Sequence, residues 1–141
     1  MSPALRTVLA VIAGVAVGVI LIMAGEALSP YQPAAGVDYT NSGPYSEWLQ
    51  SLPDRAFGIM LATFLTASFT GGFVTAWLTP PTSFPPAFAT GFILLLYTVA
   101  TVLAFPNPAW MSYSTCIGCV ALALLGGWLA KWIKHSMTIR R

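Results

Sequence analysis

The sequence predicts an all-α membrane protein with four transmembrane helices, and three features support this class: composition, long uncharged segments and clustered prolines. Of the 141 residues, 57% are hydrophobic and 7% are charged, whereas a soluble domain carries about a quarter charged residues. The mean hydropathy is +0.77. This composition excludes an ordinary soluble enzyme, a disordered chain and a nucleic-acid binder, which needs a dense basic patch.

The positions of the four spans follow from the uncharged segments. Residues 7–25 and 56–130 contain no Asp, Glu, Lys or Arg, and a helix that crosses a bilayer needs about 20 apolar residues. The longer segment is divided by prolines, which end helices because they lack a backbone donor; these are Pro80, Pro81, Pro85, Pro86, Pro106 and Pro108. We expect one domain over residues 1–141, with spans at 5–28, 55–79, 87–105 and 109–132, an outer loop at 29–54 and a cytoplasmic tail at 133–141.

The first span is interpreted as a true transmembrane helix, because its apolar run exceeds the 7–15 residues typical of a signal peptide. Orientation follows from the distribution of Lys and Arg. Basic residues flank the two ends of the chain, at Arg6, Lys131, Lys134, Arg140 and Arg141, whereas the loop at 29–54 has none. The positive-inside rule places both termini in the cytoplasm of a bacterial-type inner membrane.

A short helix is expected in the outer loop. Pro44 can open it after Asn41 or Ser42, since proline suits the first helical position. One apolar face follows at helical spacing, made of Tyr45, Trp48, Leu49 and Leu52,. This pattern predicts an interfacial helix on the outer membrane surface. The alternative is an irregular loop whose aromatic rings lie at headgroup level.

Small residues predict how the spans pack. One face of the first span carries Gly14, Gly18 and Gly25, and one face of the second carries Gly58 and Gly72. Smooth faces let helix backbones approach closely. We expect these faces to pack against each other in the core of the bundle. The alternative, which we consider second, is that they form the interface of a homodimer.

Two double glycines suggest an internal repeat. Gly71-Gly72 in the second span and Gly126-Gly127 in the fourth are each followed by an aromatic residue, with a Trp four residues further on. This pairing suggests a duplicated two-helix hairpin related by an axis along the membrane normal. The alternative is that small residues and Trp recur in any membrane helix.

Glu26 is an acidic residue inside or close to a predicted span, and it is therefore a candidate functional residue. It lies near the outer end of the first span, where the helix dipole disfavours an anion. It would handle a proton or cation, as intramembrane acids often do, or form a clasp with Arg55 on the same side. The interfacial position favours the clasp. In the second span, Thr63, Thr66 and Thr70 form a stripe that would line a polar path or bond to their own helix.

Cys116 and Cys119 form a C-x-x-C pair in the outer half of the fourth span. In this motif and in the number of spans, the chain resembles the vitamin K epoxide reductase family, four-helix membrane enzymes whose C-x-x-C lies beside a quinone. Those enzymes carry a second cysteine pair in the first outer loop, whereas residues 29–54 contain no cysteine. Packing is the preferred interpretation of Cys116 and Cys119, since cysteine is common in buried helices.

The first half of the chain is also similar to a group of small bacterial four-helix membrane proteins to which no function is assigned. The similarity covers roughly residues 1–80 and rests on scattered motifs, namely Gly25-Glu26, Pro30, Tyr31, Pro33, Leu52-Pro53 and Gly71-Gly72. It implies the four-helix architecture and marks Glu26 as a residue of interest.

Three functions are compatible with these patterns. We expect a non-enzymatic protein that acts through helix contacts, as an accessory subunit or scaffold of a membrane complex or as a homo-oligomer surrounded by lipid. The alternatives are a small oligomeric transporter or channel that uses Glu26 and the threonine stripe, and a thiol oxidoreductase that uses Cys116 and Cys119. No cofactor, metal or nucleic-acid partner is expected, because His135 is the one histidine and phosphate-binding motifs are absent,.

Overall fold

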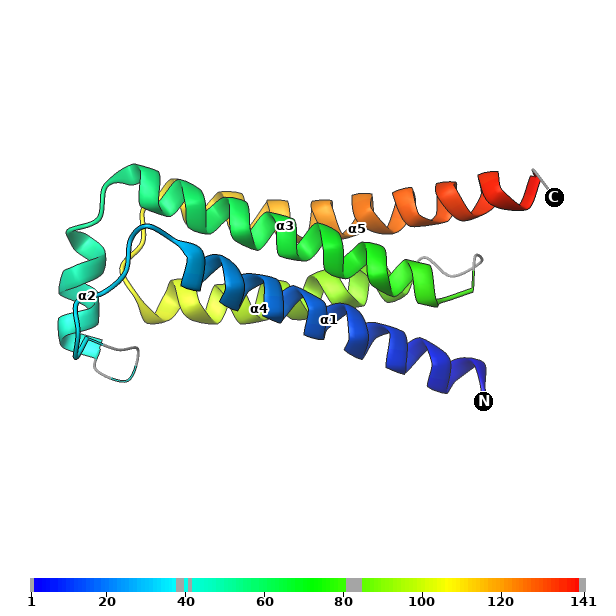
Figure 1. Ribbon diagram of the computed structural model, residues 1–141, viewed down its shortest axis with the longest axis horizontal. Coiled ribbons are helices and arrows are strands. Elements are labelled where there is room, and N and C mark those ends of the chain that lie inside the picture. The colour runs from blue at the N-terminus through cyan, green and yellow to red at the C-terminus, as the bar shows by residue number, and fades with distance from the viewer. Residues whose placement is uncertain (1, 38–39, 41, 81–84, 140–141) are drawn as a thin grey trace.

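The computed structural model describes residues 2–37, 40, 42–80 and 85–139, and Figure 1 shows the arrangement of its helices. The secondary structure of these residues is helical, with no strand. Five helices follow in order: α1 (Pro3–Leu28), α2 (Ser42–Gln50), α3 (Asp54–Leu78), α4 (Pro85–Ala104) and α5 (Ala109–Ile139). The chain is therefore all-α, as the sequence predicts.

The four long helices form one elongated bundle. Both α1 and α5 pack against α3 and α4, and α3 also packs against α4. The two chain termini lie at one end, here called the terminal end, while α2 lies across the other, here called the α2 end (Figure 1). An even number of long helices accounts for both termini being at the same end.

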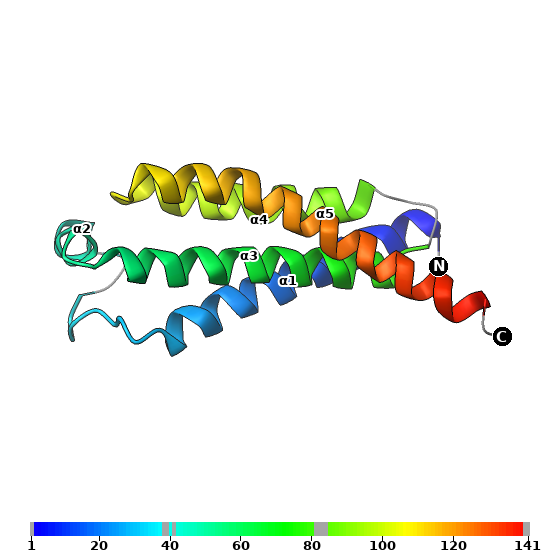
Figure 2. The ribbon, with the colours of Figure 1, turned by 90° about the horizontal axis from the view of Figure 1, so that it is seen from above.

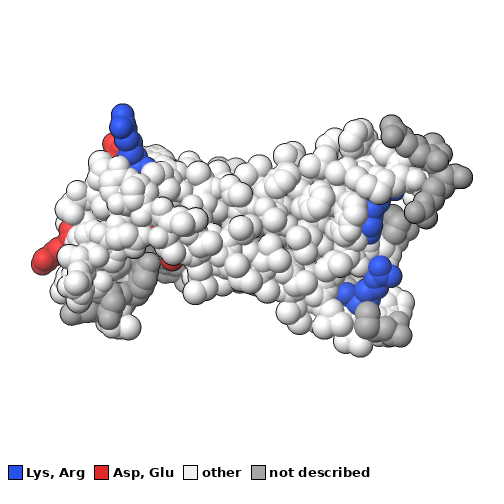
Figure 3. Space-filling model, viewed as in Figure 1, with Lys and Arg blue, Asp and Glu red and all other residues white. Residues whose placement is uncertain are grey.

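The predicted spans fall on the four long helices, with one difference at the end of the chain. Three helices, α1, α3 and α5, are long and apolar enough to cross a membrane, and α4 holds a shorter apolar segment, Pro86–Val102. The helix α5 continues through residues 133–139, which the sequence analysis assigns to a tail. On the face that Figure 3 shows, the charged side chains lie at the two ends of the molecule and the surface between them is uncharged. These features suggest a membrane protein.

Glycines bring the helix backbones into contact, most closely between α3 and α5. A Cβ atom at Gly72 would collide with the backbone of Ala123, and one at Gly126 with the carbonyl of Phe69. The other predicted packing positions that a Cβ atom would overfill are Gly14, Gly18, Gly25, Gly71 and Gly127. The helix faces that carry these glycines therefore pack against one another inside the bundle.

Gly58 is the exception, and the prediction that it packs in the core is wrong. It is exposed, and a Cβ atom there would meet nothing within 4 Å. The helix α5 crosses α3 obliquely (Figure 2), so it covers the Gly72 face near the terminal end and a different face near the α2 end. Consistent with this crossing, Phe57 and Phe64, which lie about 100° around α3 from Gly58, share a core cluster with Met111 and Cys119 of α5.

The helix α2 covers the end of the bundle. Tyr45 and Leu49, on its predicted apolar face, are buried in the same core cluster as Phe57 and Met111. The ring of Tyr45 lies edge-on to the ring of Phe105, with 4.6 Å between centroids. The apolar face of α2 thus packs on protein.

Two cations bind the last carbonyls of α3 at the terminal end. Arg6 Nε donates to the carbonyl of Leu78 at 3.0 Å, and Lys134 Nζ donates to that of Thr79 at 3.0 Å. Lys134 also lies over the ring of Trp77, 5.8 Å from its centroid. Because the last carbonyls of a helix lack intrahelical partners, these contacts satisfy acceptors that would otherwise be exposed.

Candidate functional site

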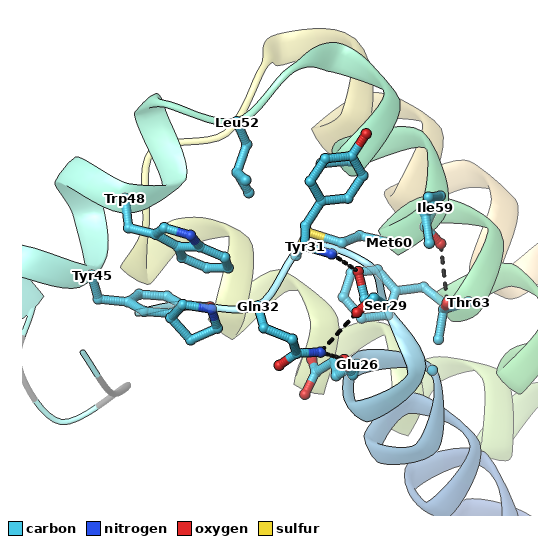
Figure 4. A pocket seen from close by; sticks show the side chains of 14 residues that line it. Glu26, Ser29, Tyr31, Gln32, Tyr45, Trp48, Leu52, Ile59, Met60 and Thr63 are labelled. Carbon is cyan, nitrogen blue, oxygen red and sulfur yellow. Dashed lines mark hydrogen bonds between the residues drawn. The ribbon is translucent and has the colours of Figure 1, made fainter. Parts of the chain in front are cut away.

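A cavity at the α2 end brings the polar residues of α1 and α3 together with the aromatic residues of α2 (Figure 4). Its volume is about 40 Å³, which is room for a few water molecules. The side chains that line it include Glu26, Ser29, Gln32 and Thr63 on the polar side and Tyr45, Trp48, Leu52, Ile59, Met60 and Phe64 on the apolar side. The cavity is therefore amphipathic.

The polar wall is built where α1 ends. The two N–H groups of the Gln32 side-chain amide are shared among three main-chain carbonyls: Nε2 lies 2.7 Å from that of Glu26, 3.3 Å from that of Ala27 and 3.0 Å from that of Ser29. Ser29 Oγ accepts a hydrogen bond from the backbone N–H of Tyr31 at 3.2 Å. These bonds fold the segment after α1 back across its last turn, so that this segment becomes one side of the cavity.

Glu26 lies on this wall and is half-buried. Its neighbour Gly25 packs directly on Thr63 of α3, because a Cβ atom at Gly25 would collide with the Thr63 side chain. The close approach of α1 and α3 at this point holds Glu26 and Thr63 beside the same cavity. Arg55 is exposed and is not part of the lining; the clasp between Glu26 and Arg55 stays a prediction.

The apolar wall is formed by α2 and α3. The rings of Tyr45 and Trp48 lie 5.2 Å apart at a tilt of 41°, and Met60 and Phe64 line the cavity from α3. Phe64 and Ile22 are almost completely buried in the core cluster. Apolar side chains therefore pack the bundle interior next to the cavity.

The three predicted threonines have different environments. Thr63 donates to the carbonyl of Ile59 at 3.0 Å, Thr66 to Ala62 at 2.8 Å and Thr70 to Thr66 at 2.9 Å. Each hydroxyl thus bonds to its own helix, which is the structural alternative considered for this stripe. Thr63 lines the cavity, whereas Thr66 is exposed on the surface of α3.

A different set of hydroxyls lies in the core. Thr75 Oγ1 is 2.7 Å from Thr90 Oγ1, and it approaches the Ala10 carbonyl of α1 at 3.3 Å. These contacts join three helices. Sequence spacing does not distinguish Thr75 from Thr66, because both lie in the same apolar helix. The positions of the neighbouring helices decide which of the two is buried.

The two cysteines lie in the interior of α5, beyond its first turn. Cys116 is exposed and Cys119 is buried, and both are free thiols. Cys119 Sγ is 4.0 Å from Thr98 Oγ1 and belongs to the core cluster. The redox pair stays a prediction.

Sequence reasoning missed Gln32, which holds the polar wall in place. A usable signal is its position: it follows the end of α1 by four residues, where a side-chain amide can reach the last carbonyls of the helix. It also assigned Tyr45 and Trp48 to the membrane surface, whereas both line the cavity.

Comparisons with protein-family models, with curated proteins and with solved structures find no match for this chain. In the part of the chain that the structure describes, no group of three or more His, Cys, Asp or Glu side chains could hold a metal ion. The candidate site is therefore identified from the residues that line the cavity and not from a related protein.

Proposed function

We propose that this chain is a four-span protein of a bacterial inner membrane, with both termini in the cytoplasm and α2 outside. The 25 residues of α3 rise about 37 Å at 1.5 Å per residue, which exceeds a hydrocarbon core of about 30 Å. The uncharged surface between the charged ends supports this arrangement (Figure 3). The shorter α4 spans with its ends near the two interfaces.

Within this topology, the function that the geometry supports best is binding of a small ligand at the outer end of the bundle. One observation carries the proposal: Glu26, Gln32 and Thr63 meet two aromatic rings of α2 around one cavity. Ligand sites in proteins are commonly apolar clefts with a few polar groups that fix the orientation of the ligand. The cavity has this character.

Binding is favoured over conduction by the surroundings of the cavity. Thr63, Thr66 and Thr70 direct their hydroxyl hydrogens to their own backbone. Phe64 and Ile22 fill the neighbouring interior. A conducting path needs a lining of polar groups across the membrane, so we propose a receptor or ligand-dependent subunit in preference to a channel.

A pair of matched tryptophan variants tests this proposal. Ile59 lines the cavity and is 37% exposed, while Ile93 of α4 is 41% exposed and lies outside the cavity. The protein is extracted with its surrounding lipid, and co-purified small molecules are identified by mass spectrometry. We expect a stoichiometric ligand in the wild type and in Ile93→Trp, and its loss in Ile59→Trp. A wild type without a ligand, or equal ligand in all three proteins, contradicts the proposal.

A second candidate function, an accessory subunit that binds a partner helix, is favoured by the exposed surface of α3. Gly58, Ala62 and Thr66 follow each other at intervals of four residues, and all three are exposed. Such a ridge of small residues lets another helix approach closely in a membrane. Gly58→Leu should abolish co-purification of a membrane partner, whereas Leu96→Phe on the exposed face of α4 should not. Retention of the partner by Gly58→Leu contradicts this candidate.

We also propose that the bundle arose from a duplicated two-helix hairpin. The paired double glycines support this, because Gly72 packs on the backbone of α5 and Gly126 packs on the backbone of α3. Each copy would therefore use its glycines to contact the other copy.

A further inference from the structure

A second cavity lies between α4 and α5 at the α2 end, where Figure 2 shows the two helices side by side. Its volume is about 170 Å³. It is lined by Val99 and Val102 of α4 and by Ser112, Thr115 and Cys116 of α5. None of these residues lines the cavity between α1, α2 and α3, so the second cavity is a separate candidate site.

The hydroxyl of Thr115 has no hydrogen-bond partner in the part of the chain that the structure describes. Thr115 is completely buried, and a buried hydroxyl without a partner is destabilising. The other buried threonines each donate to the main-chain carbonyl four residues earlier: Thr75 to Gly71, Thr79 to Thr75, Thr90 to Pro86 and Thr98 to Leu94. The hydroxyl proton of Thr115 can therefore be donated to a molecule in the cavity.

The wall that α5 contributes is polar and uncharged. Ser112, Thr115 and Cys116 lie on one face of α5, because residues three and four positions apart are neighbours on a helix. They provide two hydroxyl donors and a thiol, which is a weak donor. No charged side chain among the described residues lines the cavity, and burial of an unpaired charge is costly. A complementary ligand therefore has an acceptor atom and no charge.

The surface around the cavity is apolar. Ile117 of α5 and Leu96 of α4 are exposed large hydrophobic residues beside it, and Val102 lies two residues before the end of α4. In the proposed topology, the cavity thus opens to lipid just inside the outer interface, and a ligand enters from the membrane. An apolar cavity of about 150 Å³ can hold one benzene molecule, so this cavity has room for a six-membered ring.

We propose that the cavity between α4 and α5 binds an uncharged apolar molecule, of the size of a six-membered ring, through one hydrogen-bond-accepting oxygen. Thr115 and Ser112 donate to this oxygen, and the ring lies against Val99 and Val102. Water suits the cavity less well, because an ordered buried water makes about three hydrogen bonds and the lining side chains offer two hydroxyls and a thiol. This site is additional to the proposed function and rests on the proposed membrane topology.

The thiol of Cys116 reports whether the cavity is occupied, because it lines the cavity and is exposed. The full-length protein in phosphatidylglycerol nanodiscs is labelled with N-ethylmaleimide, and the labelling rate is measured by intact mass. Three probes are compared at equal concentrations in the membrane: cyclohexanone, methylenecyclohexane, which has CH₂ in place of the oxygen, and cyclohexanecarboxylate, which adds a charge. We expect cyclohexanone to slow labelling at a concentration at least about tenfold lower than methylenecyclohexane, which corresponds to about 1.4 kcal/mol. Cyclohexanecarboxylate should have no effect.

Two threonine variants identify the donor. Thr115→Val keeps the shape of the side chain and removes the hydroxyl, so it should reduce cyclohexanone to the potency of methylenecyclohexane. Thr101→Val is the matched control, because Thr101 donates to the carbonyl of Tyr97 at 3.1 Å and does not line the cavity. It should retain the full preference. Equal protection by the two neutral probes in the wild type, or an unchanged preference in a folded Thr115→Val variant, overturns the proposal.

Two further controls separate this site from lipid and from the first cavity. In the absence of a probe, Cys116 should be labelled at the same rate in ester-linked and ether-linked phosphatidylglycerol; faster labelling in the ether lipid would place a lipid ester in the cavity and overturn the proposal. Ile59→Trp should leave the effect of cyclohexanone unchanged, because Ile59 lines the other cavity. Loss of the effect in Ile59→Trp would show that cyclohexanone acts through that other cavity.

Discussion

The side-chain amide of Gln32 lies 2.7 Å from the main-chain carbonyl oxygen of Glu26. This bond ties the segment after α1 to the last turn of that helix, beside the residue whose carboxyl group faces the cavity. The polar wall therefore depends on a hydrogen bond between a loop and a helix end, and its rigidity can be tested independently of any ligand.

Replacing Gln32 with Leu should loosen this wall. The variant loses the hydrogen bonds to the end of α1, each with a net value of about 1 kcal/mol or less at a partly exposed site. We expect the free energy of unfolding to fall by about 1 kcal/mol and limited proteolysis to cleave the segment after α1 faster. Gln50→Leu, at the exposed end of α2, is the control and should change neither quantity. Equal cleavage of the two variants would show that Gln32 does not hold the segment.

The contact between α3 and α5 predicts a large effect of a single methyl group. Gly126→Ala places a Cβ atom against the carbonyl of Phe69, and overpacking of this kind typically costs about 1–3 kcal/mol. Gly58→Ala has open space around it and should leave stability unchanged or raise it by up to about 1 kcal/mol. Unfolding in mixed micelles measures both. Similar stabilities of the two variants would argue against backbone contact at Gly126.

The hydroxyl pair Thr75 and Thr90 should couple α3 to α4. A double-mutant cycle with Thr75→Val and Thr90→Val should give a coupling free energy of about 0.6 kcal/mol, the average for hydrogen bonds inside membrane proteins. A cycle that combines Thr66→Val with Thr90→Val is the control. It should give no coupling, because Thr66 donates to its own helix on the exposed surface of α3. The prediction fails if both cycles give the same coupling.

The cysteines should differ in reactivity. Cys116 is exposed, whereas Cys119 has no exposed surface. A membrane-permeant maleimide should therefore label Cys116 in the folded protein and label Cys119 only after unfolding, as measured by intact mass. Cys116→Ser should prevent labelling of the folded chain. Equal labelling rates at both thiols would indicate that the interior around Cys119 opens readily.

Sequence patterns predict the helices well and the site only in part. Apolar length and the prolines predict α1, α3, α4 and α5. The spacing of Tyr45, Trp48 and Leu49 predicts α2, but the helix begins at Ser42, before Pro44, and ends at Gln50, so that Leu52 lies beyond it. These are local properties of the chain. Helical periodicity also groups Gly58 with Gly72 on one face, but it cannot show that α5 crosses α3 and covers only the part near Gly72.

The same limit applies to the cavity. Glu26 is recognisable in the sequence because the dipole at the C-terminal end of a helix disfavours an anion. No comparable sequence pattern identifies Gln32. Its role follows from the way residues 29–33 fold back over α1. The threonine stripe shows the converse: Thr63 reaches the cavity because Gly25 lets α1 approach it, while Thr66 is exposed on the surface of α3.

Photoaffinity labelling tests the central claim, that a ligand binds in the cavity between α1, α2 and α3, most directly. A small aryl diazirine is irradiated with the full-length protein in phosphatidylglycerol nanodiscs, and labelled peptides are mapped by mass spectrometry. We predict saturable labelling within residues 45–64, competed by an excess of the same aryl compound without the diazirine and lost in Ile59→Trp but retained in Ile93→Trp. Labelling that is concentrated on α4 and α5, or that is unaffected by Ile59→Trp, would contradict the account.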